Sequence, residues 1–291
     1  MNKQLHNIKK LKENMAHCTI CPRKCLAKRF EGEIGACRQT DKIKIASYNL
    51  HFGEEPPISG AKGSGTIFLT SCSLACVFCQ NYPISQLDNG KIYEPDEVVD
   101  IMIKLQKKGA HNINFVTPTH YSPLLAECVY NAREKGLNIP IVYNCSGYES
   151  EETIKLLDGI VDIYLVDAKY SNNELGRKYS NVSDYVEINK KAIKKMYEQV
   201  GHLVMKDEIA QKGIVVRHLM LPGNLANTKG VIDMLKEIST DMYVSLMGQY
   251  HPTHNAYDFD ELSKGLTGYE YSEGVKYLKK SGFEQGWIQE I

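Results

Sequence analysis

The stretch TSCSLACVFCQN, residues 70–81, places three cysteines within eight residues. Cys72, Cys76 and Cys79 directly follow a short apolar run at 66–69 that is typical of a buried strand. A structural zinc takes four protein ligands, so three thiolates leave a zinc site incomplete. Three thiolates are sufficient, however, to hold three irons of a [4Fe–4S] cluster and to leave the fourth iron without a protein ligand.

An iron without a protein ligand gives this loop a chemical use. It can coordinate a chelating amino acid, such as the amino and carboxylate groups of S-adenosylmethionine (SAM). An electron from the cluster then breaks the sulfonium C–S bond to give methionine and a 5′-deoxyadenosyl radical, while the protein supplies placement and excludes water. We therefore predict Cys72, Cys76 and Cys79 as catalytic cluster ligands, with Phe78 lying against the adenine ring.

On the C-terminal side of this loop, short apolar runs alternate with helical patterns. Six runs predict parallel strands that are covered on both faces, at 66–72, 112–118, 139–147, 161–169, 213–221 and 242–250. Helix start and stop signals mark the stretches between them, for example at 95–109. The pattern predicts an α/β fold, a partial (β/α)6 TIM barrel, because two of eight units are missing. The alternative is a doubly wound sheet, but no G-x-G-x-x-G follows the first strand.

Polar side chains stand at the ends of the predicted strands. In parallel α/β folds the active site forms at the carboxyl ends of the strands. We therefore expect six residues to converge there: Cys72, Thr117, Asn144, Asp167, Arg217 and His251.

A second group of cysteines lies upstream, spaced Cys-x2-Cys-x3-Cys-x11-Cys. Its members are Cys18, Cys21, Cys25 and Cys37. Four thiolates complete either one zinc site or one cubane. The short spacings favour an auxiliary [4Fe–4S] cluster, and the long last gap favours zinc. Of the two, we expect zinc.

This cysteine pattern divides the chain into two predicted parts. Residues 1–60 form a cysteine-rich N-terminal metal-binding extension and linker, and residues 61–291 form the barrel. The linker NLHFGEEPPISG, residues 49–60, carries two acids and two prolines. We expect a rigid loop over the barrel mouth that contacts substrate, with a solvated connector as the equal alternative.

The three-cysteine loop resembles the signature of the radical SAM superfamily, and the resemblance extends to about residue 255. More narrowly, GSGTIFLTSCSLACVFCQNYPIS, with CPRKC upstream, resembles the subgroup of pyruvate formate-lyase activating enzyme-like proteins. The resemblance of LVDAKY to the D-x-K element of glycyl-radical activases implies that Asp167 helps to hold a cation and that Lys169 reaches the SAM carboxylate. VVRHLMLPG and QYHP resemble two further activase segments, which implies site roles for Arg217 and His251.

One element of the activases is missing. They usually carry Gly-Gly-Glu after the second strand to recognise the SAM amino group, whereas this chain reads NFVTPTHY. Thr117, Thr119 and His120 are the candidates to replace that contact.

The resemblance implies a radical SAM oxidoreductase that abstracts hydrogen from a glycine of a partner glycyl-radical enzyme, with an electron donor such as flavodoxin or ferredoxin. The alternatives are radical modification of a small molecule or peptide and, in a different class, a non-catalytic zinc-binding adaptor. Lys+Arg and Asp+Glu number 35 each, so the net charge does not favour nucleic acid or membrane as a partner. The N-terminus lacks the apolar core of a signal peptide, and we expect a cytoplasmic protein.

Overall fold

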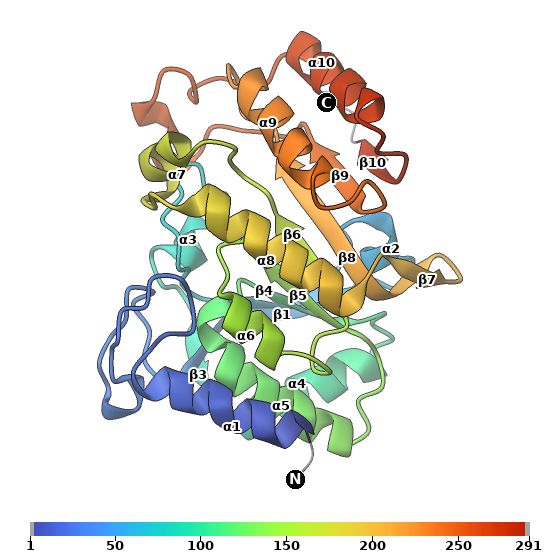
Figure 1. The fold of residues 1–291 in the computed structure, drawn as a ribbon. Coiled ribbons are helices and arrows are strands. Elements are labelled where there is room, and N and C mark those ends of the chain that lie inside the picture. Colours follow the sequence, from blue (N-terminus) through green and yellow to red (C-terminus); the bar gives the residue numbers. More distant parts are fainter. Residues whose placement is uncertain (1–2, 289–291) are drawn as a thin grey trace.

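The computed structural model describes residues 3–288, and its centre is a ten-stranded sheet (Figure 1). The main path through the sheet runs β10-β9-β8-β6-β5-β4-β2-β1-β3, and β7 (Val204–Lys206) pairs with β8. Seven strands along this path are parallel: β2 (Ser64–Leu69), β4 (Ile113–Val116), β5 (Ile141–Cys145), β6 (Ile163–Asp167), β8 (Ile209–Leu219), β9 (Tyr243–Met247) and β10 (Gly286–Ile288). The six predicted strands are thus confirmed, and β10 adds a seventh.

The parallel strands follow one another in chain order, so every crossover runs in the same direction and the connecting helices gather on one face. Figure 1 shows these helices in front of the sheet: α4 (Pro95–Lys107), α5 (Ser122–Glu134), α6 (Glu151–Leu156), α8 (Tyr185–Val200), α9 (Leu225–Lys236) and α10 (Gly268–Lys280). A doubly wound sheet would place helices on both faces. The fold is therefore mixed α/β with a largely parallel sheet, consistent with a partial barrel.

Helix α4 illustrates how the sequence builds this layer. Glu94 and Glu97 form a capping box at its start, and Pro95 occupies the first turn, where no backbone N–H is needed. Its stripe of Val98 and Met102 is fully buried against the outer face of the sheet. Each such side chain contributes about 1.5–3 kcal/mol through burial, which holds the helix in place.

The sequence pattern did not predict the N-terminal helix α1 (Lys3–Ala16) or strand β1 (Ile43–His51). Helix α1 is rich in lysine and asparagine, yet Leu11 and Met15 are fully buried where it packs against α5 and α6. Strand β1 pairs antiparallel with β2 and with β3 (Lys91–Tyr93), so it belongs to the same sheet as the barrel strands. The domain boundary at residue 60 stays a prediction. No helix within residues 3–288 has the length and apolar character needed to cross a membrane.

The expectation that residues 49–60 form a loop over the barrel mouth is wrong. Because β1 is antiparallel to β2, it ends beside Ser64, at the amino ends of the parallel strands. The short helix α2 (Pro56–Ser59) then packs against β8, with Ile58 buried among inward-facing apolar side chains of the barrel. The linker therefore closes the bottom of the barrel, opposite the three-cysteine loop.

Candidate functional site

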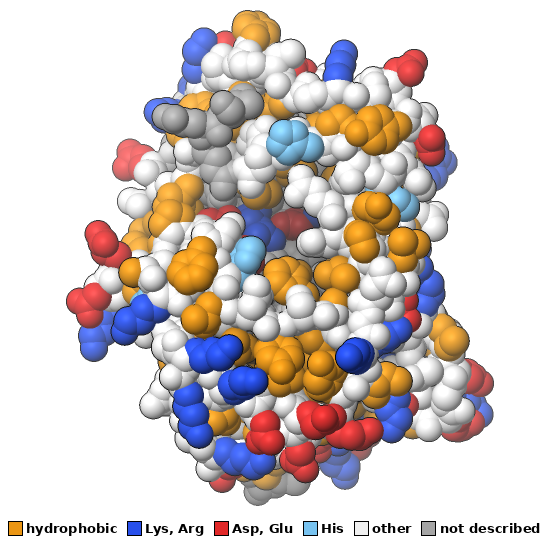
Figure 2. Space-filling model, turned by 180° about the vertical axis from the view of Figure 1, so that it is seen from behind, with side chains coloured by type: hydrophobic (Ala, Val, Ile, Leu, Met, Phe, Trp, Pro, Cys, Tyr) orange, Lys and Arg blue, Asp and Glu red, His pale blue; other side chains and the backbone are white. Residues whose placement is uncertain are grey.

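The carboxyl ends of the parallel strands enclose a pocket of about 450 Å³. Figure 2 shows a hollow on the face opposite to that of Figure 1, with basic and acidic side chains at its base and hydrophobic and histidine side chains around it. The pocket is lined by all three cysteines of the loop and by four of the five other predicted strand-end residues, namely Thr117, Asn144, Asp167 and Arg217. The fifth, His251, is exposed and is not among the residues that line the pocket.

The three-cysteine loop (residues 70–81) follows β2 directly and gives each sulfur one polar neighbour. The backbone N–H of Leu74 donates to the Cys72 Sγ at 3.3 Å. The Cys76 Sγ lies 2.9 Å from the Ser180 Oγ, and the Cys79 Sγ lies 3.1 Å from the Ser85 Oγ. Such contacts to sulfur are among the factors that set the potential of an iron–sulfur cluster.

The donor set of this loop fits a [4Fe–4S] cluster with one iron left open. Its three cysteines line the pocket. A fourth cysteine that lines the pocket, Cys145 of β5, is buried and lies outside the loop. Within residues 3–288, no three His, Cys, Asp or Glu side chains are arranged to hold a single metal ion. A cubane does not need that arrangement, because each thiolate binds a different iron.

Two residues beside the pocket have a strained backbone. Ser71, directly before Cys72, has φ +68°, and Thr117, at the end of β4, has φ +61°. A β-branched residue rarely adopts this left-handed region, and such strain concentrates at functional sites. The Thr117 N–H donates to the Asn144 carbonyl at 2.8 Å, which fixes the turn that carries its side chain to the pocket. Thr117 therefore stays a candidate for the contact that replaces Gly-Gly-Glu.

The other two candidates for that contact lie outside the pocket. Thr119 is buried and its hydroxyl donates to the Glu149 Oε1 at 2.6 Å. The His120 ring is also buried, with its Nε2 2.8 Å from the Thr70 carbonyl oxygen. Both side chains serve packing behind the loop.

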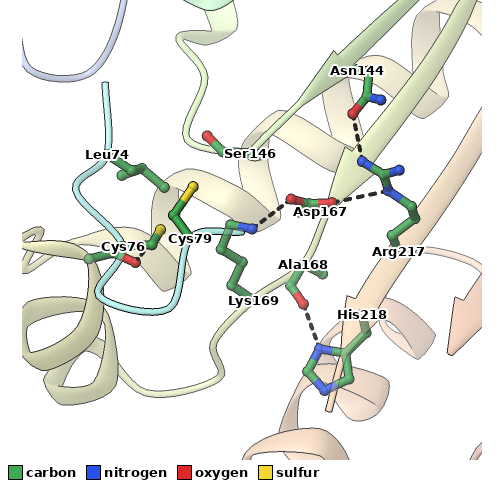
Figure 3. Close-up of polar contacts among 12 residues, drawn as sticks. Leu74, Cys76, Cys79, Asn144, Ser146, Asp167, Ala168, Lys169, Arg217 and His218 are labelled. Carbon is green, nitrogen blue, oxygen red and sulfur yellow. Dashed lines mark hydrogen bonds and ion pairs between the residues drawn. The ribbon is translucent and has the colours of Figure 1, made fainter. Parts of the chain in front are cut away.

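Charged side chains from two neighbouring strands form a chain across the pocket (Figure 3). The Lys169 Nζ lies 2.6 Å from one Asp167 oxygen, and the Arg217 Nε lies 3.2 Å from the other. Arg217 also donates through its Nη2 to the Asn144 Oδ1 at 2.5 Å. Gly147 makes the close packing behind Asp167 possible, because a Cβ there would lie 2.2 Å from the Asp167 carbonyl oxygen.

These groups are ionised despite their burial. Burial alone would raise the pKa of the Asp167 carboxyl, but Lys169 and Arg217 lower it below its usual range. Burial would lower the pKa of Lys169, and the Asp167 carboxylate, followed by the Cys76 sulfur, raises it overall. The pKa of Arg217 is likewise raised by Asp167 against the effect of burial. Lys169, Asp167 and Arg217 therefore form a chain of charged groups in the pocket.

A further expectation concerns the aromatic side chain of Phe78. Phe78 lines the pocket and packs edge-on against Tyr179 and Tyr250, with ring centroids 6.4 and 6.2 Å apart. Its position fits the predicted contact with an adenine, which stays a prediction. His218, next to Arg217 on β8, is a buried histidine whose ring bonds the Ala168 carbonyl at 2.6 Å and the Thr228 hydroxyl at 3.0 Å.

The four upstream cysteines lie in an irregular segment, residues 17–42. Cys18, Cys21 and Cys37 are buried, and Cys25 is exposed. A Cβ on Gly35 would lie 3.1 Å from the Cys25 Sγ and 3.7 Å from the Cys37 Sγ, so these two sulfurs face the same point. Burial raises the pKa of Cys21 to about 12, and the nearby Cys37 and Cys18 sulfurs add to this. The four thiols thus lie near one another.

This four-cysteine segment packs directly behind the three-cysteine loop. The Ser71 hydroxyl donates to the Cys37 carbonyl. The Arg23 Nε donates to the Ser73 carbonyl at 3.0 Å, and the Arg38 Nη2 donates to the Ser85 carbonyl at 2.7 Å. The residues on both sides of Cys72 are therefore held by the upstream segment.

Several residues of the pocket were not predicted from the sequence. His51 and Glu54 come from β1 and the linker, and Phe68 comes from the inner face of β2. The His51 and Phe68 rings meet edge to face at 5.7 Å. Glu54 is nearly buried and contacts Arg217. The two adjacent acids of the linker were the only sequence feature that pointed to Glu54. The residues that Glu54 contacts lie far away in the sequence, so its place in the pocket could not be inferred.

Comparisons with known proteins agree with this geometry. The family described as "Radical SAM superfamily" matches residues 66–223, more than half of the chain. The protein MJ0674 of Methanocaldococcus jannaschii, described as uncharacterized, is 33% identical over 275 residues, which cover 91% of this chain and 75% of that protein. MJ0808 of the same organism, also uncharacterized, is 29% identical over 177 residues, which cover 55% of this chain and 51% of MJ0808.

A solved structure shows the same fold. SuiB of Streptococcus suis, bound to S-adenosylmethionine, superposes with a TM-score of 0.50 at 12% sequence identity. The superposition covers 76% of this chain and 48% of SuiB, so this chain matches about half of that protein. At this identity the likeness concerns the fold alone.

Proposed function

The chain belongs to the radical SAM superfamily and is a radical SAM enzyme, and we propose that Cys72, Cys76 and Cys79 hold its [4Fe–4S] cluster and that the adjoining pocket binds SAM. The observation that carries this proposal is that three sulfurs and the Asp167–Lys169 pair line one pocket. Membership of an enzyme superfamily removes the reason to expect a non-catalytic zinc-binding adaptor.

Different residues of the pocket have different roles in binding SAM. When bound, the cluster supplies the electron that cleaves SAM to methionine and the 5′-deoxyadenosyl radical, which abstracts hydrogen from the substrate. Lys169 offers an ammonium to the SAM carboxylate, and Asp167 orients that ammonium through its 2.6 Å contact. Leu74, Phe78 and Leu221 form an apolar wall that excludes water from the site.

Product analysis tests this function. Protein reconstituted with iron and sulfide under anaerobic conditions should convert SAM to 5′-deoxyadenosine and methionine in equal amounts when dithionite is added. Chromatography of the quenched reaction measures both products. If the reconstituted, SAM-supplied protein formed neither, the proposed function would be wrong.

For the substrate, we propose a glycine residue of a partner glycyl-radical enzyme. The support is the resemblance of LVDAKY and of the three-cysteine loop to the glycyl-radical activases. A glycyl-radical enzyme from the same organism, mixed with reduced protein and SAM, should show the EPR doublet of a glycyl radical. If 5′-deoxyadenosine forms but no protein radical does, a small molecule or peptide becomes the preferred substrate class. The electron donor of the cell is then proposed to be a flavodoxin or ferredoxin, tested by replacing dithionite with each reduced protein.

At the N-terminus, we propose that Cys18, Cys21, Cys25 and Cys37 hold a second metal group. Support comes from the proximity of the four sulfurs and from the lack of regular structure in residues 17–42 beyond one short turn in the described chain. Four clustered thiolates suit either one zinc ion or one cubane, and zinc, the metal expected from the sequence, stays the first proposal. Metal analysis separates the two: about eight irons per chain for a second cubane, and about four irons with one zinc otherwise.

A further inference from the structure

Glu54 brings a carboxylate into the pocket from outside the family-matched residues 66–223. It lies in the linker that closes the bottom of the barrel, just before α2. The Glu54 N–H donates to the Ser59 hydroxyl at 3.0 Å, and the Asn112 side chain donates to the Ile58 carbonyl at 2.7 Å. The linker is therefore tied down on both sides of the turn, and the Glu54 side chain points from a fixed backbone into the barrel.

The Glu54 carboxylate closes a ring of hydrogen bonds with Arg217 and Asn144. Its Oε2 accepts from the Arg217 Nη1 at 3.0 Å, and its Oε1 accepts from the Asn144 Nδ2 at 3.2 Å. Arg217 in turn donates to the Asn144 Oδ1. Asn114 adds a further donor to the Glu54 Oε1 at 2.9 Å. The side chain of Glu54 is only 8% exposed, so these contacts are its main environment.

This arrangement balances the charge of the pocket. Arg217 and Lys169 are cations, and Asp167 contacts both of them. Asp167 is the other anion of this chain of contacts, whereas the neighbouring Glu55 carboxyl also acts on Arg217 but has its pKa raised by burial, which favours its neutral form. SAM itself carries a net positive charge, because its sulfonium and ammonium groups outnumber its carboxylate. An Arg217 cation left without Glu54 would repel such a ligand, and the repulsion would be strong because these side chains are largely removed from water.

We propose that Glu54 is a positioning residue of the cofactor pocket: it holds the Arg217 guanidinium against Asn144 and supplies the negative charge that lets the pocket accept a sulfonium cation. The inference rests on the proposed binding of SAM in this pocket. It assigns the linker, which lies outside the family-matched residues, a part in cofactor recognition.

Calorimetric binding to the anaerobic, cluster-loaded protein tests this with SAM and with S-adenosylhomocysteine, which lacks the sulfonium charge. Glu54→Gln keeps the shape of the side chain and removes its charge. We expect SAM to bind about tenfold more weakly and S-adenosylhomocysteine less than about twofold more weakly. Glu54→Asp keeps the charge and should restore most of the preference for SAM.

The matched control is Glu127→Gln, which removes the same charge from the ion pair of Glu127 with Lys12, between α1 and α5. It should leave the binding of both ligands unchanged. Equal weakening of SAM and S-adenosylhomocysteine by Glu54→Gln, or no weakening of either, would overturn the role of Glu54. Wild-type protein that binds neither ligand would instead overturn the proposed SAM pocket, so the two failures are distinguishable.

Discussion

The two cysteine-rich regions lie against each other but differ in what surrounds their sulfurs. All three cysteines of the loop at 70–81 line the pocket and face Lys169 and Asp167 across it. Three of the four cysteines in residues 17–42 are buried, and none of the four lines that pocket in the described structure. A site with three ligands and an adjoining cavity can bind a further molecule, whereas a site with four ligands is complete.

The contacts between the two regions suggest how they work together. Ser71 and Ser73 flank Cys72, and both are bonded to the four-cysteine segment through Cys37 and Arg23. The three-cysteine loop, which is the proposed open site, is therefore supported by the four-cysteine segment, which is the proposed closed site. The comparison teaches that the position of each thiol group, rather than the number of cysteines alone, separates a catalytic role from a supporting role.

Removal of one ligand from the open site should have the largest effect. Cys76→Ala leaves two thiolates for a cluster that has only three, so SAM cleavage should fall by at least about 100-fold and the iron content of the site should drop. Cys128→Ala is the matched control, because Cys128 is fully buried in the core away from the pocket. Product formation and iron analysis measure both variants. Undiminished cleavage by Cys76→Ala would remove the distinction between the two regions.

Removal of one ligand from the closed site should act on stability and metal content. Cys21→Ser should release the second metal group and lower the melting temperature by several degrees, since residues 17–42 would lose their cross-link. The EPR signal of the cluster that responds to SAM should persist. Metal analysis and thermal unfolding check this. Unchanged metal content in Cys21→Ser would show that these thiols are unligated.

Lys169→Ala tests the charged wall of the open site. Loss of a charge-assisted hydrogen bond to the SAM carboxylate should weaken binding by about 1.5–3 kcal/mol, or roughly tenfold to 100-fold. Iron content should stay the same. Lys190→Ala removes a lysine from a surface pair with Glu237 and should leave SAM affinity unchanged. Equal affinities in wild type and Lys169→Ala would place the SAM carboxylate elsewhere.

The smallest expected effect on SAM cleavage concerns Glu149, which is buried and should act on stability alone. Burial raises its pKa from 4.5 to about 8, against hydrogen bonds from Thr119 and Tyr143 that lower it. Below about pH 4.5 both folded and unfolded states are protonated, so burial carries no pH-dependent cost. As the pH rises towards about 8, the unfolded state ionises first and the folded protein loses stability.

Glu149→Gln removes this dependence while keeping the side-chain shape. Its stability relative to wild type should therefore increase between pH 5 and pH 8, a window that follows from the raised pKa. Denaturant unfolding at several pH values measures the difference. A constant difference across that range would show that Glu149 does not titrate as its burial implies.

The sequence predicted the six barrel strands because each is a short, continuous apolar run, and a parallel strand covered on both faces needs such a run. The same order of strands placed Cys72, Asp167 and Arg217 at one edge, which the structure confirms. Strand β1 was missed because only part of it is buried, as in IASYNLH, which also suits a loop. Glu54 could not be predicted as a site residue, because its partner Arg217 lies 163 positions away.

The prediction that His251 lies in the pocket was wrong for a related reason. His251 follows β9 and its side chain is exposed. Met247, the last residue of β9, and Gln249, two residues later, line the pocket, whereas His251 does not. A residue four positions past a strand end depends on the loop conformation, which sequence periodicity does not determine. The carry-over of a motif is therefore safest within the strand itself, as for Asp167.

The central claim is that the loop at Cys72, Cys76 and Cys79 leaves a coordination position that SAM occupies. EPR of the dithionite-reduced protein, recorded during a titration with SAM, tests it most directly. We expect the signal of this cluster to change with SAM and to be lost in Cys76→Ala, while any signal from the four-cysteine segment stays constant. A reduced cluster signal that does not respond to saturating SAM would contradict the account.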